Sequence, residues 1–75
     1  MELRYTGRIA IIGSSQFAGV GAVYVVASNY NQVGNVAEVV KSVNFKISLV
    51  HKSNDVDELT VTTYNESYSW FVLYL

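Results

Sequence analysis

The chain has 75 residues, of which 51% are hydrophobic and only 15% are charged, and its formal net charge is −1. A chain of this length forms one domain, residues 1–75, and the small net charge creates no field to attract nucleic acid or an anionic membrane. The absence of cysteine excludes disulfides and thiolate metal sites, and a single histidine, His51, cannot form a zinc site alone. We therefore expect no metal and no cofactor, with stability supplied by packing or self-association.

The longest uncharged stretch lies between Ile9 and Ala37. The run Gly13-Ser14-Ser15-Gln16 interrupts it and predicts a turn between two apolar strands instead of a membrane span. Glu2, Arg4 and Arg8 alternate with apolar residues, which is unlike a secretory signal. The expectation is a soluble, intracellular protein.

Residues 2–12 alternate between apolar and polar side chains, a pattern of period two that predicts a strand. Leu3, Tyr5, Ile9 and Ile11 would share its core-facing side, and Gly7 would mark a bulge. Residues 13–19 would form a loop. Residues 20–27, rich in valine, are expected to form a second strand, although a buried helix beginning near Ser15 remains an alternative.

The region 35–43 carries the clearest helix signal. Asn35 is a suitable N-cap, and Glu38 lies three residues later, as in a capping box. An apolar stripe follows at helical spacing: Val36, Val39, Val40 and Val43. We expect a short helix here, packed on the sheet.

Alternation returns in residues 45–52 and 59–64, which predicts an antiparallel hairpin with the acidic segment 53–58 as a solvated loop. A last strand is expected over residues 68–75. The predicted order of elements is ββαβββ, an α+β fold with a mostly antiparallel sheet of about five strands and one short helix.

The last strand would place Phe71, Leu73 and Leu75 on one face and an aromatic set on the other. A single short helix covers only one face of a sheet, so the aromatic face is expected to be a protein interface: Tyr68, Trp70, Val72 and Tyr74. The alternative is a rolled sheet that covers both faces within one copy. The main hypothesis is a non-enzymatic interaction or structural module, homo-oligomeric through its sheet edge and this strand, or bound there to a partner protein. Small chains of this kind are common in viral and mobile-element genomes, an association that suggests a viral protein.

The second hypothesis is a sheet that binds single-stranded nucleic acid through phosphate contacts and base stacking. Its candidate residues would share one outer face: Arg4, Arg8, Lys46, Lys52 and Tyr64.

Catalytic motifs are not found in the sequence. The segment after Gly13 has Ser15 where a dinucleotide fingerprint requires glycine. His51 has serines and acidic residues near it, but no surrounding elbow or oxyanion motif. Asp55, Asp57 and Glu58 lack the spacing of a calcium loop. We expect neither an enzyme nor a cation site.

Overall fold

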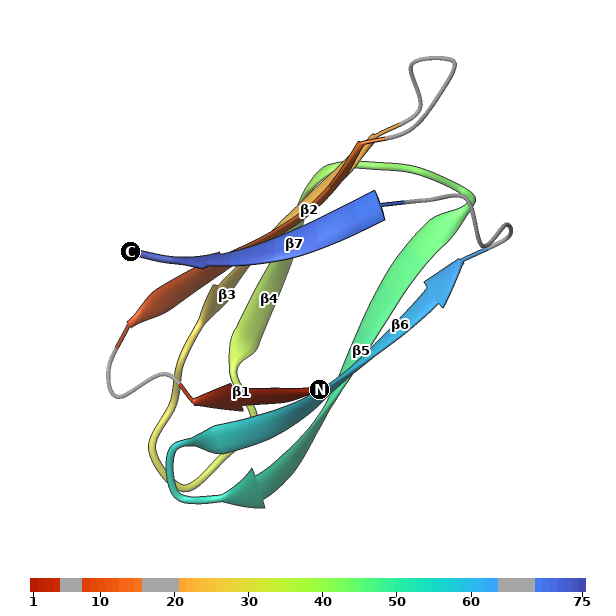
Figure 1. Cartoon of the computed structure of the whole chain (residues 1–75). Helices are drawn as coiled ribbons and strands as arrows, with labels where there is room; N and C mark the ends of the chain where they lie inside the picture. Colours follow the sequence, from red (N-terminus) through yellow and green to blue (C-terminus); the bar gives the residue numbers. More distant parts are fainter. Residues whose placement is uncertain (5–7, 16–20, 64–68) are drawn as a thin grey trace.

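The computed structural model describes residues 1–4, 8–15, 21–63 and 69–75 of the chain, and these residues form antiparallel strands without any helix (Figure 1). The seven strands are β1 (Glu2–Arg4), β2 (Ile9–Ser15), β3 (Ala22–Ala27), β4 (Asn35–Val40), β5 (Phe45–Ser53), β6 (Val56–Thr63) and β7 (Ser69–Tyr74). The fold is therefore all-β, and the predicted α+β class is wrong.

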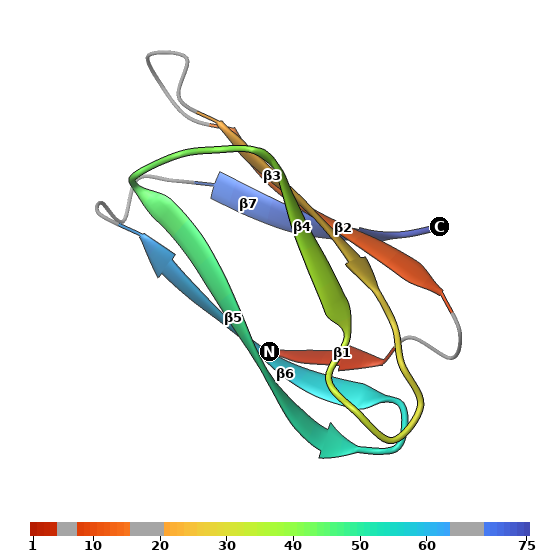
Figure 2. The ribbon, with the colours of Figure 1, turned by 180° about the vertical axis from the view of Figure 1, so that it is seen from behind.

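The strands form two sheets, one with the order β1-β6-β5 and one with the order β4-β3-β2-β7. Figures 1 and 2 show the two sheets facing each other as the layers of a small sandwich. β7 lies at one edge of the four-stranded sheet, and β4, at the other edge, leads through residues 41–44 into β5.

The core lies between the two sheets, where alternate residues of each strand point inward, as the period of a strand requires. Its buried members come from both sheets: Leu3, Ala10, Ile12, Ala22, Tyr24, Val26, Phe45 and Leu59. Partly buried side chains extend it along β5, β6 and β7: Ile47, Leu49, Val61, Val72 and Tyr74. Two facing layers thus bury one face of every sheet without a helix.

The expected helix over residues 35–43 is instead the edge strand β4, paired with β3 from Ala27↔Asn35 to Val23↔Val40. A bulge between Val23 and Tyr24 shifts the register, which accommodates the extra residue of β4. The reason is physical: a two-turn helix rich in β-branched valine is weak, whereas an open strand edge offers a full row of hydrogen bonds. Glu38 faces Tyr24 of β3 and caps nothing.

The expected N-terminal strand over residues 2–12 is divided between the sheets, with β1 on β6 and β2 between β3 and β7. Leu3 is buried as predicted, but in β2 the buried apolar side chains are Ala10 and Ile12, so Ile9 and Ile11 face away from the core. Gly13, Ser14 and Ser15 continue β2 rather than forming a turn. Tyr5 and the bulge predicted at Gly7 lie outside the described residues.

The prediction of a strand near residues 20–27 is confirmed by β3, and the alternative of a buried helix is wrong for the described part, which begins at residue 21. The β5–β6 hairpin is also confirmed, from Phe45↔Thr63 to Ser53↔Val56. Its loop is shorter than expected, because Val56 and Asp57 belong to β6 and are buried. No helix within the described residues is long and apolar enough to cross a membrane.

Candidate interaction surfaces

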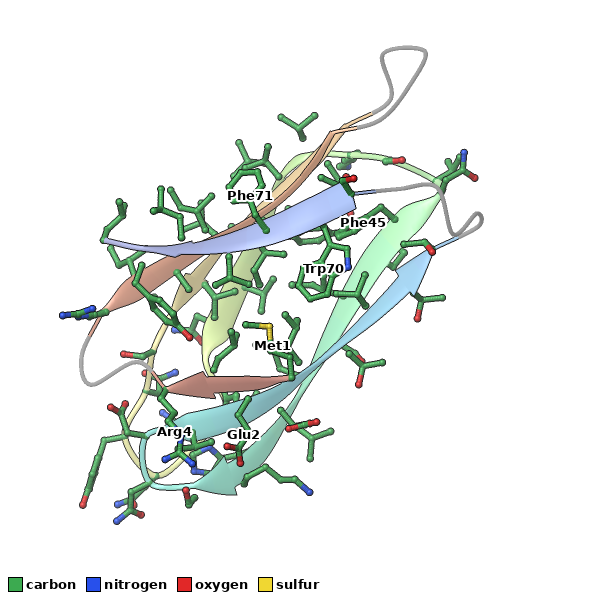
Figure 3. All side chains as sticks on the ribbon, viewed as in Figure 1. Met1, Glu2, Arg4, Phe45, Trp70 and Phe71 are labelled. Carbon is green, nitrogen blue, oxygen red and sulfur yellow. The ribbon has the colours of Figure 1, made fainter. Side chains whose placement is uncertain are left out.

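The C-terminal strand β7 presents two different faces. Figure 3 shows Trp70 pointing into the space between the sheets and Phe71 pointing to the opposite side. Val72 and Tyr74 lie on the same face of β7 as Trp70 and pack against the core. Phe71, Leu73 and Leu75 lie on the other face and are exposed. The predicted interface set therefore lies on the inner face of β7, with Trp70 still 38% exposed. Tyr68 lies outside the described residues, so that interface remains a prediction.

The outward side of the four-stranded sheet is apolar across its whole width. The strand registers align its residues in three rows. From β4 to β7, the rows are Val40, Val23, Gly13 and Phe71, then Ala37, Val25, Ile11 and Leu73, and last Asn35, Ala27, Ile9 and Leu75. We call these twelve residues the outer apolar face. Asn35 is its one polar member, and none of the twelve is charged.

Large side chains on the outer apolar face are in contact with solvent. Leu75 is 66% exposed, Phe71 54% and Leu73 50%, and Val40 and Ile9 are nearly as accessible. Scattered apolar residues are normal on a protein surface, whereas a contiguous apolar patch is a candidate interaction site. The sequence carries part of this signal in Phe71, Leu73 and Leu75. The opposite, aromatic side of the last strand was predicted to be the interface because a single layer of sheet was expected.

The opposite side of the molecule, the outward side of the three-stranded sheet, is polar. It carries Glu2, Arg4, Lys46, Lys52 and Glu58, of which Glu2 and Arg4 form an ion pair of 2.9 Å that projects away from β7 in Figure 3. Both signs of charge alternate on this side, so it has no uniformly basic character.

The candidate nucleic-acid residues are only partly brought together. Arg4, Lys46 and Lys52 lie on strands of the three-stranded sheet, while Arg8 precedes β2 of the other sheet. Arg4 is paired with Glu2, and the Lys46 Nζ atom lies 3.0 Å from a Glu38 carboxylate oxygen. Tyr64 lies outside the described residues. The nucleic-acid hypothesis remains a prediction, and two of its four cations, Arg4 and Lys46, are paired with carboxylates.

An open groove of about 490 Å³ runs along β6, and Trp70 of β7 bounds it from the other sheet. It is lined by Met1, Glu58, Leu59, Thr60, Val61, Thr63 and Trp70. The single charged side chain of this lining, Glu58, pairs with the Met1 ammonium group at 3.2 Å. The groove therefore offers a tryptophan ring, aliphatic groups and hydroxyl groups.

A polar cluster joins the two sheets at the opposite edge. The Tyr24 hydroxyl group donates to Glu38 Oε2 at 2.5 Å and lies 3.0 Å from the Phe45 carbonyl oxygen. Burial, reinforced by the hydrogen bond to Glu38, raises the pKa of Tyr24 to about 12. Hydrogen bonds from Tyr24 and then from Lys46 hold the pKa of Glu38 below its usual value. These contacts satisfy the polar groups of the cluster and connect the two sheets.

A second cluster surrounds Asp57, which is only 1% exposed. Its Oδ2 accepts a hydrogen bond from the Gly34 backbone N–H at 2.8 Å, and its Oδ1 lies 2.9 Å from His51 Nδ1. The expectation that Asp57 belongs to a solvated loop is wrong, since the carboxylate fixes the β3–β4 connection to β6. His51 is thus oriented by an acid, but no serine of the described residues completes a nucleophile–base pair with it. Across those same residues, no group of three or more His, Cys, Asp or Glu side chains could hold a metal ion.

Comparisons with known proteins give no relative from which function could be transferred: no family model, no curated protein and no solved structure matches this chain.

Proposed function

We propose that this protein is a non-enzymatic interaction module that forms a homodimer, with the C-terminal strand β7 and the rest of the outer apolar face as its contact surface. The observation that carries the proposal is the three-row apolar face, which spans all four strands of one sheet. Burial of such a surface is the main favourable term in most protein associations.

The character of the face favours a second copy as the occupant. Two identical faces bury no charge when they meet, and a two-fold axis makes one patch its own complement. Five large side chains of the face are between 44% and 66% exposed, so a partner would cover substantial apolar area. Two stacked sheets are also a normal mode of β-sheet packing.

Sedimentation velocity on the purified protein at about 100 µM tests the proposal. We expect a dimer for the wild type and a monomer for Leu73→Asp, because Leu73 lies in the middle row of the face and the dimer would have to bury the new carboxylate. Leu75→Asp, in the outermost row, is expected to weaken the dimer less.

Val50→Asp is the matched control, since Val50 is 57% exposed but belongs to the polar outward side of the three-stranded sheet. This variant should remain dimeric. Circular dichroism of each variant checks that the fold is kept. A wild-type protein that sediments as a monomer, or equal dissociation by Val50→Asp and Leu73→Asp, contradicts the proposal.

A further inference from the structure

β1 covers only part of the strand with which it pairs. β1 spans Glu2–Arg4, whereas β6 spans Val56–Thr63. The pairing on this side ends at Leu59, whose N–H donates to the Met1 carbonyl at 2.6 Å and whose carbonyl accepts from the Met1 amine at 2.9 Å. Within the described residues, no strand lies beside the remainder of β6 on this side.

The remainder of β6 has backbone groups directed to this open side. In an antiparallel ladder, alternate residues direct both their N–H and their C=O to the same neighbour. Because Leu59 directs both groups toward β1, Val61 and Thr63 direct theirs to the same side, while Thr60 and Thr62 bond to β5. An exposed row of this kind is a template for another strand.

The groove described above adjoins this open edge. Thr60, Val61 and Thr63 form one wall, and Trp70 of β7 enters from the other sheet (Figure 3). The four-stranded sheet has β7 at this position, and the three-stranded sheet has only the short β1. Within the described residues, β1 is therefore the only strand on this side of β6, and it ends before the stretch of β6 that faces Trp70.

We propose that this edge binds an extended segment of a partner polypeptide, which adds to the three-stranded sheet antiparallel to β6 and continues the row begun by β1. The segment forms backbone hydrogen bonds with Val61 and Thr63 over about four residues, a length of roughly 13 Å. This surface and its partner are distinct from the outer apolar face and from the dimer proposed for it.

The chemistry of the groove specifies the side chains of the partner. Residues of the incoming strand that pair with Val61 and Thr63 point inward, toward Trp70, because directly opposite residues share a face. The inward-facing part of the groove lining is uncharged, with Leu59, Val61, Thr63 and Trp70, so it favours uncharged inward side chains. Apolar β-branched residues at every second position fit this requirement.

Tryptophan fluorescence provides a direct test, because Trp70 is the single tryptophan of the chain. The probe is the capped peptide acetyl-Lys-Val-Thr-Val-Thr-Val-Lys-amide, titrated into the full chain. We expect a saturable blue shift as the peptide shields Trp70 from water. No change in emission at millimolar peptide contradicts the proposal.

Two methylated peptides test the hydrogen-bonding pattern. In the proposed register, the valines face Trp70 and direct their N–H groups to β6, so N-methylation of the valines should weaken binding at least about tenfold. N-methylation of the threonines, whose N–H groups point away from β6, should leave binding intact. Equal binding of the two methylated peptides contradicts strand addition.

Two protein variants complete the test. Val61→Pro removes an N–H on the open side, where proline is tolerated in an edge strand, and should abolish the blue shift. Leu73→Asp should bind the peptide as the wild type does, because Leu73 lies on the outer apolar face. Loss of binding in Leu73→Asp would contradict the independence of the two surfaces, and a monomeric wild type that still binds the peptide would contradict only the dimer.

Discussion

The ring of Phe71 lies directly over Gly13 on the neighbouring strand. The two residues are register partners of β7 and β2, and a Cβ atom at position 13 would lie 2.7 Å from the Phe71 Cζ atom. The glycine leaves a space on the sheet surface, and the aromatic ring fills it and shields the backbone. Such pairing of an aromatic residue with a strand glycine recovers stability that the glycine alone would lose.

Phe71→Ala is therefore expected to destabilise the fold by about 1 kcal/mol, although Phe71 is more than half exposed. The substitution removes the ring and uncovers the Gly13 backbone. Urea unfolding checks this value when it is measured at protein concentrations low enough for the protein to be monomeric. Leu75→Ala, which has no glycine partner, should cost less, and equal costs would contradict the role of the pair.

Gly13→Ala and Gly34→Ala are expected to differ in their effect on the free energy of unfolding. At Gly13 the new methyl group meets the tip of an exposed ring that can rotate into solvent, so the change should stay within about 1 kcal/mol. At Gly34 it meets buried Val26 at 2.9 Å and the Ala27 carbonyl oxygen at 3.0 Å, and it should cost about 1–3 kcal/mol. Thermal unfolding of both variants provides the comparison, and a reversed order would be inconsistent with the packing described.

Asp57→Asn should lower the free energy of unfolding by about 2 kcal/mol, because hydrogen bonds to a buried charged group are among the stronger ones. The substitution removes the negative charge and leaves an acceptor oxygen at only one of the two positions that face Gly34 and His51. Asp55→Asn, in the adjacent turn, is the matched control and should change stability by less than about 0.5 kcal/mol. Similar losses in both variants would argue against a special role for Asp57.

Alkaline conditions should weaken the fold through Tyr24. Its pKa is raised to about 12, whereas an unfolded tyrosine titrates near 10. The stabilisation is thus fully present below pH 10 and is lost as the pH rises toward 12. Urea unfolding between these pH values should show a smaller decline for Tyr24→Phe than for the wild type. Tyr30→Phe, at an exposed site, should follow the wild type.

Acid conditions should weaken the fold through Glu38. Because its pKa is lowered in the folded state, its stabilisation is present above the usual glutamate value and is lost as the pH falls through the lowered one. Glu38→Gln should reduce this acid dependence. Tyr24→Phe should raise the pKa of Glu38 more than Lys46→Met does, since the hydrogen bond from Tyr24 is the largest cause of the shift. Carboxyl NMR titration distinguishes these outcomes.

Local patterns in the sequence predicted the elements with strict alternation and missed those that depend on distant partners. The β5–β6 hairpin and β3 follow from period-two runs of β-branched residues. The helix signal of residues 35–43 was equally local, but the open edge of β3 offered a better set of hydrogen bonds. The N-terminal run is divided between two sheets, so the odd-numbered Leu3 and the even-numbered Ala10 both point inward. In one continuous strand, only residues of the same parity would point inward.

The candidate surface was predicted only in part for the same reason. The two side-chain sets of the last strand do lie on opposite faces, as alternation requires. Which set faces solvent depends on the second sheet, and no local pattern reports a second layer. Trp70 was therefore expected outside, whereas Phe71 holds the more exposed position.

The polar contacts between the two sheets also determine where the sandwich should open transiently. Three polar contacts hold the two sheets together on the side of β3, β4 and β5: Tyr24 with Phe45, Lys46 with Glu38, and Gly34 with Asp57. In the described residues, no hydrogen bond connects β7 to the three-stranded sheet. The two sheets should therefore separate more readily on the side of β7 than on the side of β4 and β5. Amide hydrogen exchange should be faster in β7, the C-terminal strand, than in β3, because opening of the sheets exposes β7 first.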